Sequence, residues 1–278
     1  ILGNPPWEEA MIEEDDFWTR VYPGFQGLPQ RRQEEVKAEL REERPDLVAK
    51  YQKEVADAAL LRRMLVSGDF PGMGTGDPNL YKAFCWRFWN LLSDQGGYLG
   101  FVLPRTAWST KGGYEFRREV FNSGRVTDIT TLLNTGQWVF EMEPRQTIAL
   151  TSLTKQVFVG ENKVPLRGTY TSYLEFKEEV KKDPISFTVD DIFSWNEFGS
   201  LPMFPSMQSA GVFRQIRSAP RMDLDEPSQW RIRLTEELHA TNGPREFRKR
   251  GNPYILTGAS TDIPDGYWPI FKGESFCD

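Results

Sequence analysis

Four consecutive residues near the beginning of the sequence combine side chains that can hold a planar ring. Asn4, Pro5, Pro6 and Trp7 directly follow the apolar residues 1–3, which have the composition of a buried strand. The strand must stop there, because proline has no N–H to donate to a neighbouring strand. In open α/β sheets, ligands bind outside the carboxyl ends of the strands. A polar side chain, two rigid prolines and an aromatic face at such a position predict a loop that handles a nucleobase.

The spacing of apolar residues predicts the elements that support this loop. A helical repeat of three and four residues, divided by Pro45, covers residues 29–67. A further helix follows Asn79, with an inward face expected to consist of Leu80, Phe84, Phe88, Leu91 and Leu92. Strands are predicted at residues 98–104, 126–134 and 147–153, and a helix at residues 114–122. The last two strands have a short connection, so they are expected to be antiparallel.

The sequence changes in character after residue 158. Short segments rich in Pro, Trp and Phe replace the long strands and helices, and a short helix is expected at residues 212–218. Residues 1–158 are therefore predicted to form one α/β domain with a helical insertion at about residues 8–75. Residues 159–278 are predicted to form an irregular α+β connector and part of another domain.

The composition excludes several classes of protein. The 278 residues, of which 39% are hydrophobic, can bury a substantial core. The sequence shows no apolar run that could span a bilayer and no secretory leader. Cys85 and Cys277 lie far apart and His239 is the single histidine, so no metal site is expected and the cytoplasm is the expected location. The net charge of -6 argues against binding of nucleic acid through bulk charge, but leaves room for a local basic face.

The loop and the segments after it resemble a known family. Asn4-Pro5-Pro6-Trp7 is similar to the catalytic motif of DNA N6-adenine methyltransferases, in which Asn or Asp precedes two prolines and an aromatic residue. The order of the later segments resembles the Eco57I-like group of type IIG restriction-modification enzymes and related phage-defence methylases. These segments are Gly76-Asp77-Pro78-Asn79-Leu80-Tyr81, the strand at 98–104, Phe116-Arg117-Arg118, Val139-Phe140 before Thr147, Leu201-Pro202-Met203-Phe204 and Leu238-His239-Ala240-Thr241-Asn242. The resemblance covers nearly the whole chain.

The resemblance implies a fold, an activity and a cofactor. Residues 1–158 would be the C-terminal half of a Rossmann-like class I methyltransferase sheet, and residues 159–278 a connector and the beginning of the target-recognition region. The implied activity is transfer of a methyl group from S-adenosylmethionine to adenine N6 in double-stranded DNA, in restriction-modification or phage defence. Family members hold the cofactor with a strand and a glycine-rich turn ahead of the Asn-Pro-Pro motif, and this sequence has neither. The chain is therefore expected to be a fragment, inactive by itself, whose partners are DNA and the missing N-terminal part of the same protein.

The residues of the motif suit the chemistry that the resemblance implies. Asn4, Pro5, Pro6 and Trp7 are the expected catalytic residues. The N6 amine of adenine is a poor nucleophile, and the Asn4 carboxamide oxygen with the Pro5 carbonyl can accept its two hydrogens and favour a pyramidal nitrogen. Trp7 offers a face for a base extruded from the duplex, a contact worth on the order of 1–3 kcal/mol. This chemistry requires no metal.

The residues expected to contact DNA each have a structural alternative. They are Trp7, Asn79, Tyr81, Arg117 and Arg118. Trp7 can instead belong to the core beside Trp18, and Asn79 and Tyr81 can cap and pack a helix. Both arginines can lie on a solvated surface, and Asn-Pro-Pro also occurs as a simple turn.

Two other functions remain open from the sequence. One is a DNA-binding or assembly module of a restriction or defence complex that keeps the fold without catalysis. The other is a type IIG restriction subunit whose nuclease lies elsewhere, because no convincing nuclease cluster is present in this sequence.

Overall fold

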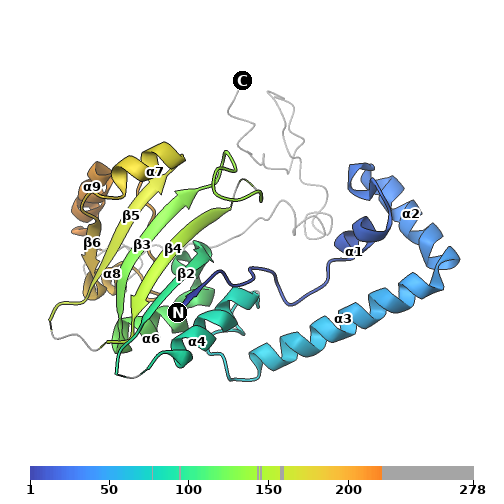
Figure 1. Cartoon of the computed structure of the whole chain (residues 1–278), viewed down its shortest axis with the longest axis horizontal. Helices are drawn as coiled ribbons and strands as arrows, with labels where there is room; N and C mark the ends of the chain where they lie inside the picture. Colours follow the sequence, from blue (N-terminus) through green and yellow to red (C-terminus); the bar gives the residue numbers. More distant parts are fainter. Residues whose placement is uncertain (77, 94, 143, 145, 157–159, 221–278) are drawn as a thin grey trace, which may run out of the picture. The chain divides into compact units, whose positions relative to one another are not determined.

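A computed structural model describes residues 1–76, 78–93, 95–142, 144, 146–156 and 160–220 of the chain. The strands are β1 (Leu2–Gly3), β2 (Tyr98–Pro104), β3 (Arg125–Leu133), β4 (Thr147–Thr154), β5 (Lys163–Tyr170) and β6 (Ile185–Thr188). They form one six-stranded sheet with the order β1-β2-β4-β3-β5-β6, which Figure 1 shows together with its helices. The α/β fold class predicted from the sequence is confirmed.

The strand directions bring four carboxyl ends, those of β1, β2, β3 and β5, to one edge of the sheet. β1 pairs with β2 in parallel, and β4 pairs antiparallel with both β2 and β3. β1, β2 and β3 therefore run in the same direction, and they end at the edge where β4 begins. β5 is parallel to β3, whereas β6 is antiparallel to β5. The antiparallel pairing predicted for residues 126–134 and 147–153 is confirmed.

The helices follow the predicted order along the chain. The α-helices are α1 (Glu14–Val21), α2 (Gln30–Glu43), α3 (Pro45–Val66), α4 (Leu80–Leu91), α5 (Thr106–Ser109), α6 (Tyr114–Ser123), α7 (Tyr173–Glu179), α8 (Val189–Trp195) and α9 (Met207–Arg217). Two 3-10 helices are η1 (Phe25–Gly27) and η2 (Lys111–Gly113). Pro45 separates α2 from α3 as predicted, because proline is tolerated in the first turn of a helix and not in its interior.

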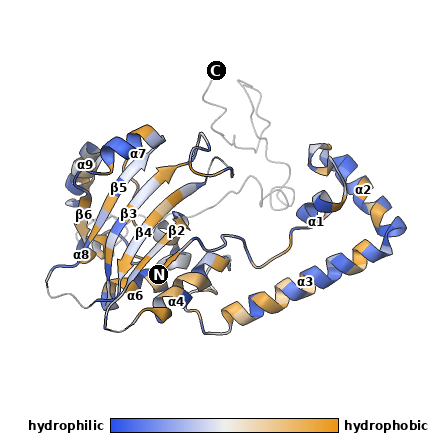
Figure 2. Cartoon of the chain, in the orientation of Figure 1, coloured by the Kyte–Doolittle hydropathy of each residue, from blue (hydrophilic) through white to orange (hydrophobic). Residues whose placement is uncertain are grey.

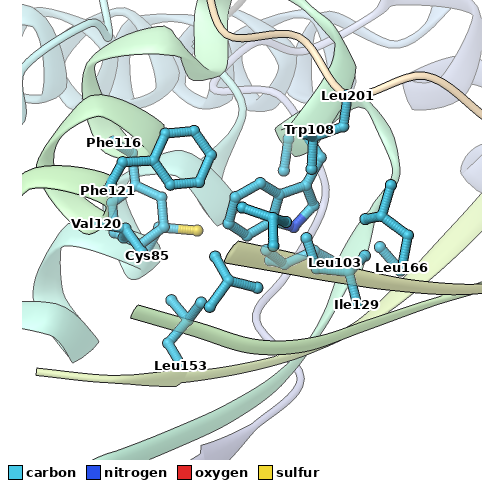
Figure 3. Close-up of a cluster of buried hydrophobic side chains, with 14 of the residues drawn as sticks. Cys85, Leu103, Trp108, Phe116, Val120, Phe121, Ile129, Leu153, Leu166 and Leu201 are labelled. Carbon is cyan, nitrogen blue, oxygen red and sulfur yellow. The ribbon is translucent and has the colours of Figure 1, made fainter. Parts of the chain in front are cut away.

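The main core packs α4, α5 and α6 against one face of the sheet. Figure 3 shows part of this cluster, with Trp108 of α5 surrounded by side chains from α4, α6 and the strands. The Trp108 indole N–H donates to the Thr151 hydroxyl at 3.0 Å, which satisfies the one polar group of a ring that is 2% exposed. Burial of a large apolar side chain contributes roughly 1.5–3 kcal/mol.

The buried face of α4 differs from the predicted one. The helix buries Tyr81, Lys82, Ala83, Cys85, Trp86 and Trp89. By contrast, Phe84 is 36% exposed and Leu91 is 54% exposed. Trp86 and Trp89 determine which face of α4 is buried, because their indole N–H groups donate to the Pro71 carbonyl and the Glu119 carboxylate.

The predicted helical insertion has a small core of its own. Phe17, Trp18, Phe25 and Val36 are at most 1% exposed and pack with apolar residues of α2 and α3. Figure 2 shows that hydrophilic residues predominate along α2, whereas hydrophilic and hydrophobic residues alternate along α3. A separate cluster of Ala10, Leu65, Met73 and Ala83 connects the end of α3 to α4.

The sheet continues beyond the predicted domain boundary at residue 158. β5 pairs with β3 and β6 pairs with β5, so residues 163–188 extend the same sheet. The compact unit that contains the sheet covers Ile1–Ala219. Residues 221–278 lie outside the described residues. The segments predicted there, including Leu238-His239-Ala240-Thr241-Asn242, lie outside the described residues, as does Asp77.

Candidate functional site

The Asn-Pro-Pro motif lies at the carboxyl edge of the parallel strands. Asn4 directly follows β1, Arg105 follows β2, and Asn134 follows β3. Ligands of open α/β sheets bind at this edge. The position predicted for the motif from the sequence, at the end of a strand, therefore agrees with the structure.

The first residues of the motif differ in exposure. Asn4 is exposed, and within the described part of the chain its carboxamide has no hydrogen-bond partner. Pro5 is buried and Pro6 is exposed. Gly3 brings the backbone close to α4, because a Cβ atom at this position would lie 3.1 Å from the Phe88 ring. The Asn4 side chain is thus available to a ligand while the backbone around it is held.

Trp7 is anchored to the sheet by both its ring and its indole nitrogen. The indole N–H donates to the Val102 carbonyl of β2 at 3.3 Å. The ring is partly buried and packs against the apolar clusters on both faces of the sheet. Trp7 is therefore a packing residue of the sheet, and it also lines the cavity described below. It does not pack beside Trp18, which belongs to the separate cluster of the helical insertion.

A short strand-like pairing brings the motif next to the beginning of α4. Glu9 and Asn79 form an isolated antiparallel bridge, and the Leu80 N–H donates to the Glu8 carbonyl at 2.8 Å. Asn79 stands at the N-cap position of α4 without capping the helix through its side chain, which donates instead to Glu9 at 3.4 Å. The pairing places Asn79 and Tyr81 beside Trp7, although more than seventy residues separate them in the sequence.

These residues line a cavity of about 550 Å³. Trp7, Asn79 and Tyr81, all predicted as DNA-contacting residues, line it together. The other lining residues are Glu9, Thr75, Gly76, Lys82, Pro104, Thr106, Thr110, Lys111, Gly112 and Gln146. The volume is within the usual range of about 300–1,000 Å³ for small-molecule sites. Asn4 is not one of the lining residues.

Tyr81 connects the helix to the loop after β2. Its ring is 3% exposed, and its hydroxyl lies 3.3 Å from the Thr106 hydroxyl. Burial raises the pKa of the Tyr81 phenol, so the hydroxyl stays protonated and can donate at neutral pH. Tyr81 therefore both packs α4 and contributes a polar group to the cavity.

The two predicted arginines have different environments, and Arg117 is not placed to contact DNA. Arg117 is 0% exposed, and its guanidinium donates to the carbonyls of Ala107, Thr110 and Phe198 at 2.7–2.8 Å. Burial lowers its pKa to about 10, which leaves it charged at neutral pH. The prediction was wrong for Arg117 because a helix pattern does not distinguish a buried cation from an exposed one. Arg118 is half exposed, pairs with Glu115 at 2.6 Å and lies over the Tyr114 ring.

A loop after β3 presents an aromatic residue that the sequence analysis did not assign to the site. Phe140 is 38% exposed. The buried Asn134 side chain holds this loop by donating to the Phe140 carbonyl and by accepting from the Val139 and Phe140 N–H groups. Val139 packs on the same apolar cluster as Trp7. The position of Asn134 as the last residue of a predicted strand was the signal that could have identified this loop.

The described residues do not form a cradle for S-adenosylmethionine. In the family that the sequence resembles, the cofactor loop follows a strand ahead of the Asn-Pro-Pro motif, whereas β1 is the edge strand of the described sheet. The residues that line the cavity all follow the motif or belong to it.

Comparisons with known proteins find only distant structural likeness. No family model matches the sequence, and no curated protein matches it. A solved chain from a type I restriction-modification system has 12% identity and a TM-score of 0.36, over 51% of this chain and 37% of that chain. A modification subunit of a putative type I restriction enzyme from Vibrio vulnificus YJ016 has 16% identity and a TM-score of 0.32, over 47% and 31%. This chain spans about a third of the length of these proteins, and likeness at this level carries no argument about function.

Two further features bear on the kind of site. In the part of the chain that the structure describes, no helix is long and apolar enough to cross a membrane. No group of three or more His, Cys, Asp and Glu side chains in that part is arranged to hold a metal ion.

Proposed function

We propose that this chain is the target-base half of a DNA N6-adenine methyltransferase, of the Eco57I-like kind that its motifs resemble. The observation that carries the proposal is the placement of Asn4-Pro5-Pro6-Trp7 at the carboxyl edge of the parallel strands, beside the cavity that Trp7 lines. The exposed Asn4 carboxamide and the fixed Trp7 ring have the properties that handling an adenine requires.

The chain's own residues position the base and its amine. The Asn4 carboxamide oxygen and the Pro5 carbonyl accept the two N6 hydrogens, which favours a pyramidal nitrogen with an available lone pair. Trp7 stacks on the extruded ring, and its bond to Val102 fixes the plane in which the ring lies. Phe140 is a second candidate for stacking. Such positioning supplies most of the rate enhancement in reactions of this kind.

The methyl donor, S-adenosylmethionine, is proposed to bind to a part of the protein ahead of the motif. The outer face of the sheet supports a partner there, because Leu2 is 89% exposed and Tyr98 is 70% exposed. The Leu2 side chain lies against Gly100 of the neighbouring strand, and its other side is exposed to solvent. The proposed partner is the N-terminal part of the same protein.

Substitution of Asn4 tests the proposed activity. In a longer chain that supplies the cofactor-binding part, Asn4→Ala is expected to lower adenine methylation by about 100-fold or more, because one positioned polar group is lost from the reacting centre. DNA binding, measured by fluorescence anisotropy, is expected to change little. The matched control is Asn122→Ala, an exposed residue of α6. Undiminished methylation by Asn4→Ala contradicts the proposal.

A non-catalytic DNA-binding or assembly module is the second candidate. It is favoured by one observation, namely that Asn4 does not itself line the cavity. This function predicts that a longer chain binds DNA but neither binds S-adenosylmethionine nor methylates adenine. Calorimetric titration of the longer chain with the cofactor separates the two candidates.

A further inference from the structure

The cavity beside the motif has two halves of different chemistry. One half is apolar and aromatic, formed by Trp7, Tyr81 and Pro104. The other half carries two lysines, three threonines and two glycines, which are Lys82, Lys111, Thr75, Thr106, Thr110, Gly76 and Gly112. Ammonium groups, hydroxyls and glycine backbone are the groups that commonly bind phosphate oxygens. A base alone would leave the second half of the cavity unused.

Lys82 is held at the cavity by its surroundings. It is 9% exposed, and its ammonium group donates to the Thr75 carbonyl at 3.4 Å. Gly112 packs directly against it, because a Cβ atom there would lie 2.7 Å from the Lys82 Nζ atom and 2.8 Å from the Thr75 carbonyl oxygen. The segments that contain Thr75 and Gly112 therefore both lie close to the Lys82 ammonium group.

Lys111 stands on the opposing loop, in η2. Its Nζ atom lies 4.5 Å from the centre of the Phe198 ring, and the residue is exposed. The Arg117 guanidinium holds this loop by donating hydrogen bonds to the carbonyls of Ala107 and Thr110. The buried guanidinium adds a third positive charge near this wall of the cavity.

The described lining residues of the cavity carry more ammonium groups than carboxylates. They include Lys82 and Lys111, whereas Glu9 is the one carboxylate among them and accepts from Asn79 at 3.4 Å. The exposed Lys111 ammonium group is a charged donor of the kind that binds phosphate oxygens.

We propose that the Lys82 and Lys111 wall binds a backbone phosphate next to the base held by Trp7, so that the cavity takes a nucleotide and not a base alone. This phosphate subsite rests on the proposed function, because that function places the base in the other half. The source of the phosphate is the nucleic-acid strand.

The affinities of small nucleotides for this chain test the subsite. The probes are adenosine, deoxyadenosine 5′-monophosphate, deoxyadenosine 3′-monophosphate, thymidine 5′-monophosphate and inorganic phosphate, titrated by ligand-observed NMR. At least one deoxyadenosine monophosphate is expected to bind about tenfold more tightly than adenosine, because charged hydrogen bonds to phosphate are added. Inorganic phosphate is expected to bind more weakly than either monophosphate.

The phosphate gain is the factor by which a deoxyadenosine monophosphate binds more tightly than adenosine. Substitutions of the two lysines test whether these residues cause it. Lys111→Met and Lys82→Met are each expected to reduce the phosphate gain and to leave the affinity for adenosine unchanged. Lys111 is exposed, so its substitution keeps the test valid if Lys82→Met fails to fold. Gly112→Ala is expected to reduce the gain by displacing the Lys82 ammonium group. Lys53→Met, at a lysine of α3 whose side chain is 80% exposed, is the matched control.

The possible results separate the subsite from the proposed function. Equal affinities for adenosine and both monophosphates overturn the subsite and leave the proposed function standing. Thymidine 5′-monophosphate that binds as tightly as the deoxyadenosine monophosphates, and more tightly than adenosine, supports the subsite and contradicts the adenine preference. Inorganic phosphate that binds as tightly as the nucleotides overturns the proposal of a nucleotide site, and absence of binding by every probe overturns the subsite.

Discussion

Arg117 and Arg118 are adjacent in the sequence and lie in opposite environments. Arg117 donates to three carbonyls that hold the loop between β2 and α6. Arg117→Lys is expected to lower the free energy of unfolding by about 2–4 kcal/mol, because lysine cannot reproduce this geometry and leaves buried acceptors unpaired. Arg118→Lys is the control, with an expected change below about 0.5 kcal/mol. Urea unfolding measures both, and equal effects of the two substitutions contradict the assigned role of Arg117.

Cys85 is expected to make the protein less stable at alkaline pH. Burial raises the pKa of its thiol above the ordinary value of 9.0. The folded protein keeps this proton where the unfolded chain releases it, so the contribution is complete below pH 9.0 and is lost as the pH rises. The slope approaches about 1.4 kcal/mol per pH unit for one proton.

Cys85→Ala separates this contribution from those of other groups. The variant is expected to be less stable at neutral pH because it leaves a small cavity, but to show a shallower loss of stability above pH 9.0. Urea unfolding at several pH values from about 8 to 10 measures the two slopes. Parallel slopes in the two proteins would rule out the contribution of Cys85.

At the scale of elements, the helical insertion has a core that is separate from the core of the sheet. Trp18→Ala removes a ring that is 1% exposed and packs against Phe17 and Tyr51. The substitution is expected to cost about 3–5 kcal/mol and to open residues 12–51 locally. Hydrogen exchange read by mass spectrometry should show loss of protection in α1 and α2 but not in β2, β3 and β4. Met64→Ala, at a residue that is 61% exposed, is the control, and a global loss of protection contradicts a separate core.

The elements also show what the sequence could predict. The strand at residues 98–104 was recognisable by its continuous apolar run, and the strand at residues 147–153 by apolar residues that alternate with a threonine-rich face. Pro45 marked the division of α2 from α3. The buried face of α4 was not predictable from apolar spacing, because Trp86 and Trp89 are buried with their N–H groups bonded to the Pro71 carbonyl and the Glu119 carboxylate, which lie in other segments. β5 was missed since Arg167 and Gly168 interrupt its apolar pattern, and the Arg167 guanidinium pairs with Asp128, which is distant in sequence. β6 has four residues, which is too short for a clear pattern.

The sequence predicted only those residues of the candidate site that are close together in the chain. The motif identified Trp7 because its residues are consecutive, whereas Lys82, Thr106 and Lys111 come from three segments that only the folded chain brings together. No local pattern marks such residues, because their common property is the cavity and not their spacing. Asn134 and Phe140 could have been predicted only from their position at the end of a strand.

At the scale of the whole molecule, the distribution of charge favours one side for the approach of the proposed nucleic-acid strand. A second groove, between residues 8–20 and α3, is lined by Glu8, Glu13, Asp16 and further carboxylates. Its basic residue Arg20 is already paired with Glu54 at 2.6 Å. This surface should repel phosphates, in contrast to the wall that contains Lys111.

Reversal of charge on the two surfaces tests this asymmetry. Glu13→Lys combined with Asp16→Lys is expected to raise the affinity for a single-stranded oligonucleotide several-fold at low salt. The gain should largely disappear at about 0.15 M salt, where screening acts over roughly 8 Å and the groove makes no direct contact with the strand. Lys111→Glu should instead lower the affinity at both salt concentrations, because a direct contact is lost. Glu178→Lys, an exposed residue of α7, is the control. Fluorescence anisotropy measures the affinities, and a gain that persists at high salt would place the strand on the acidic groove and contradict the approach along Lys111.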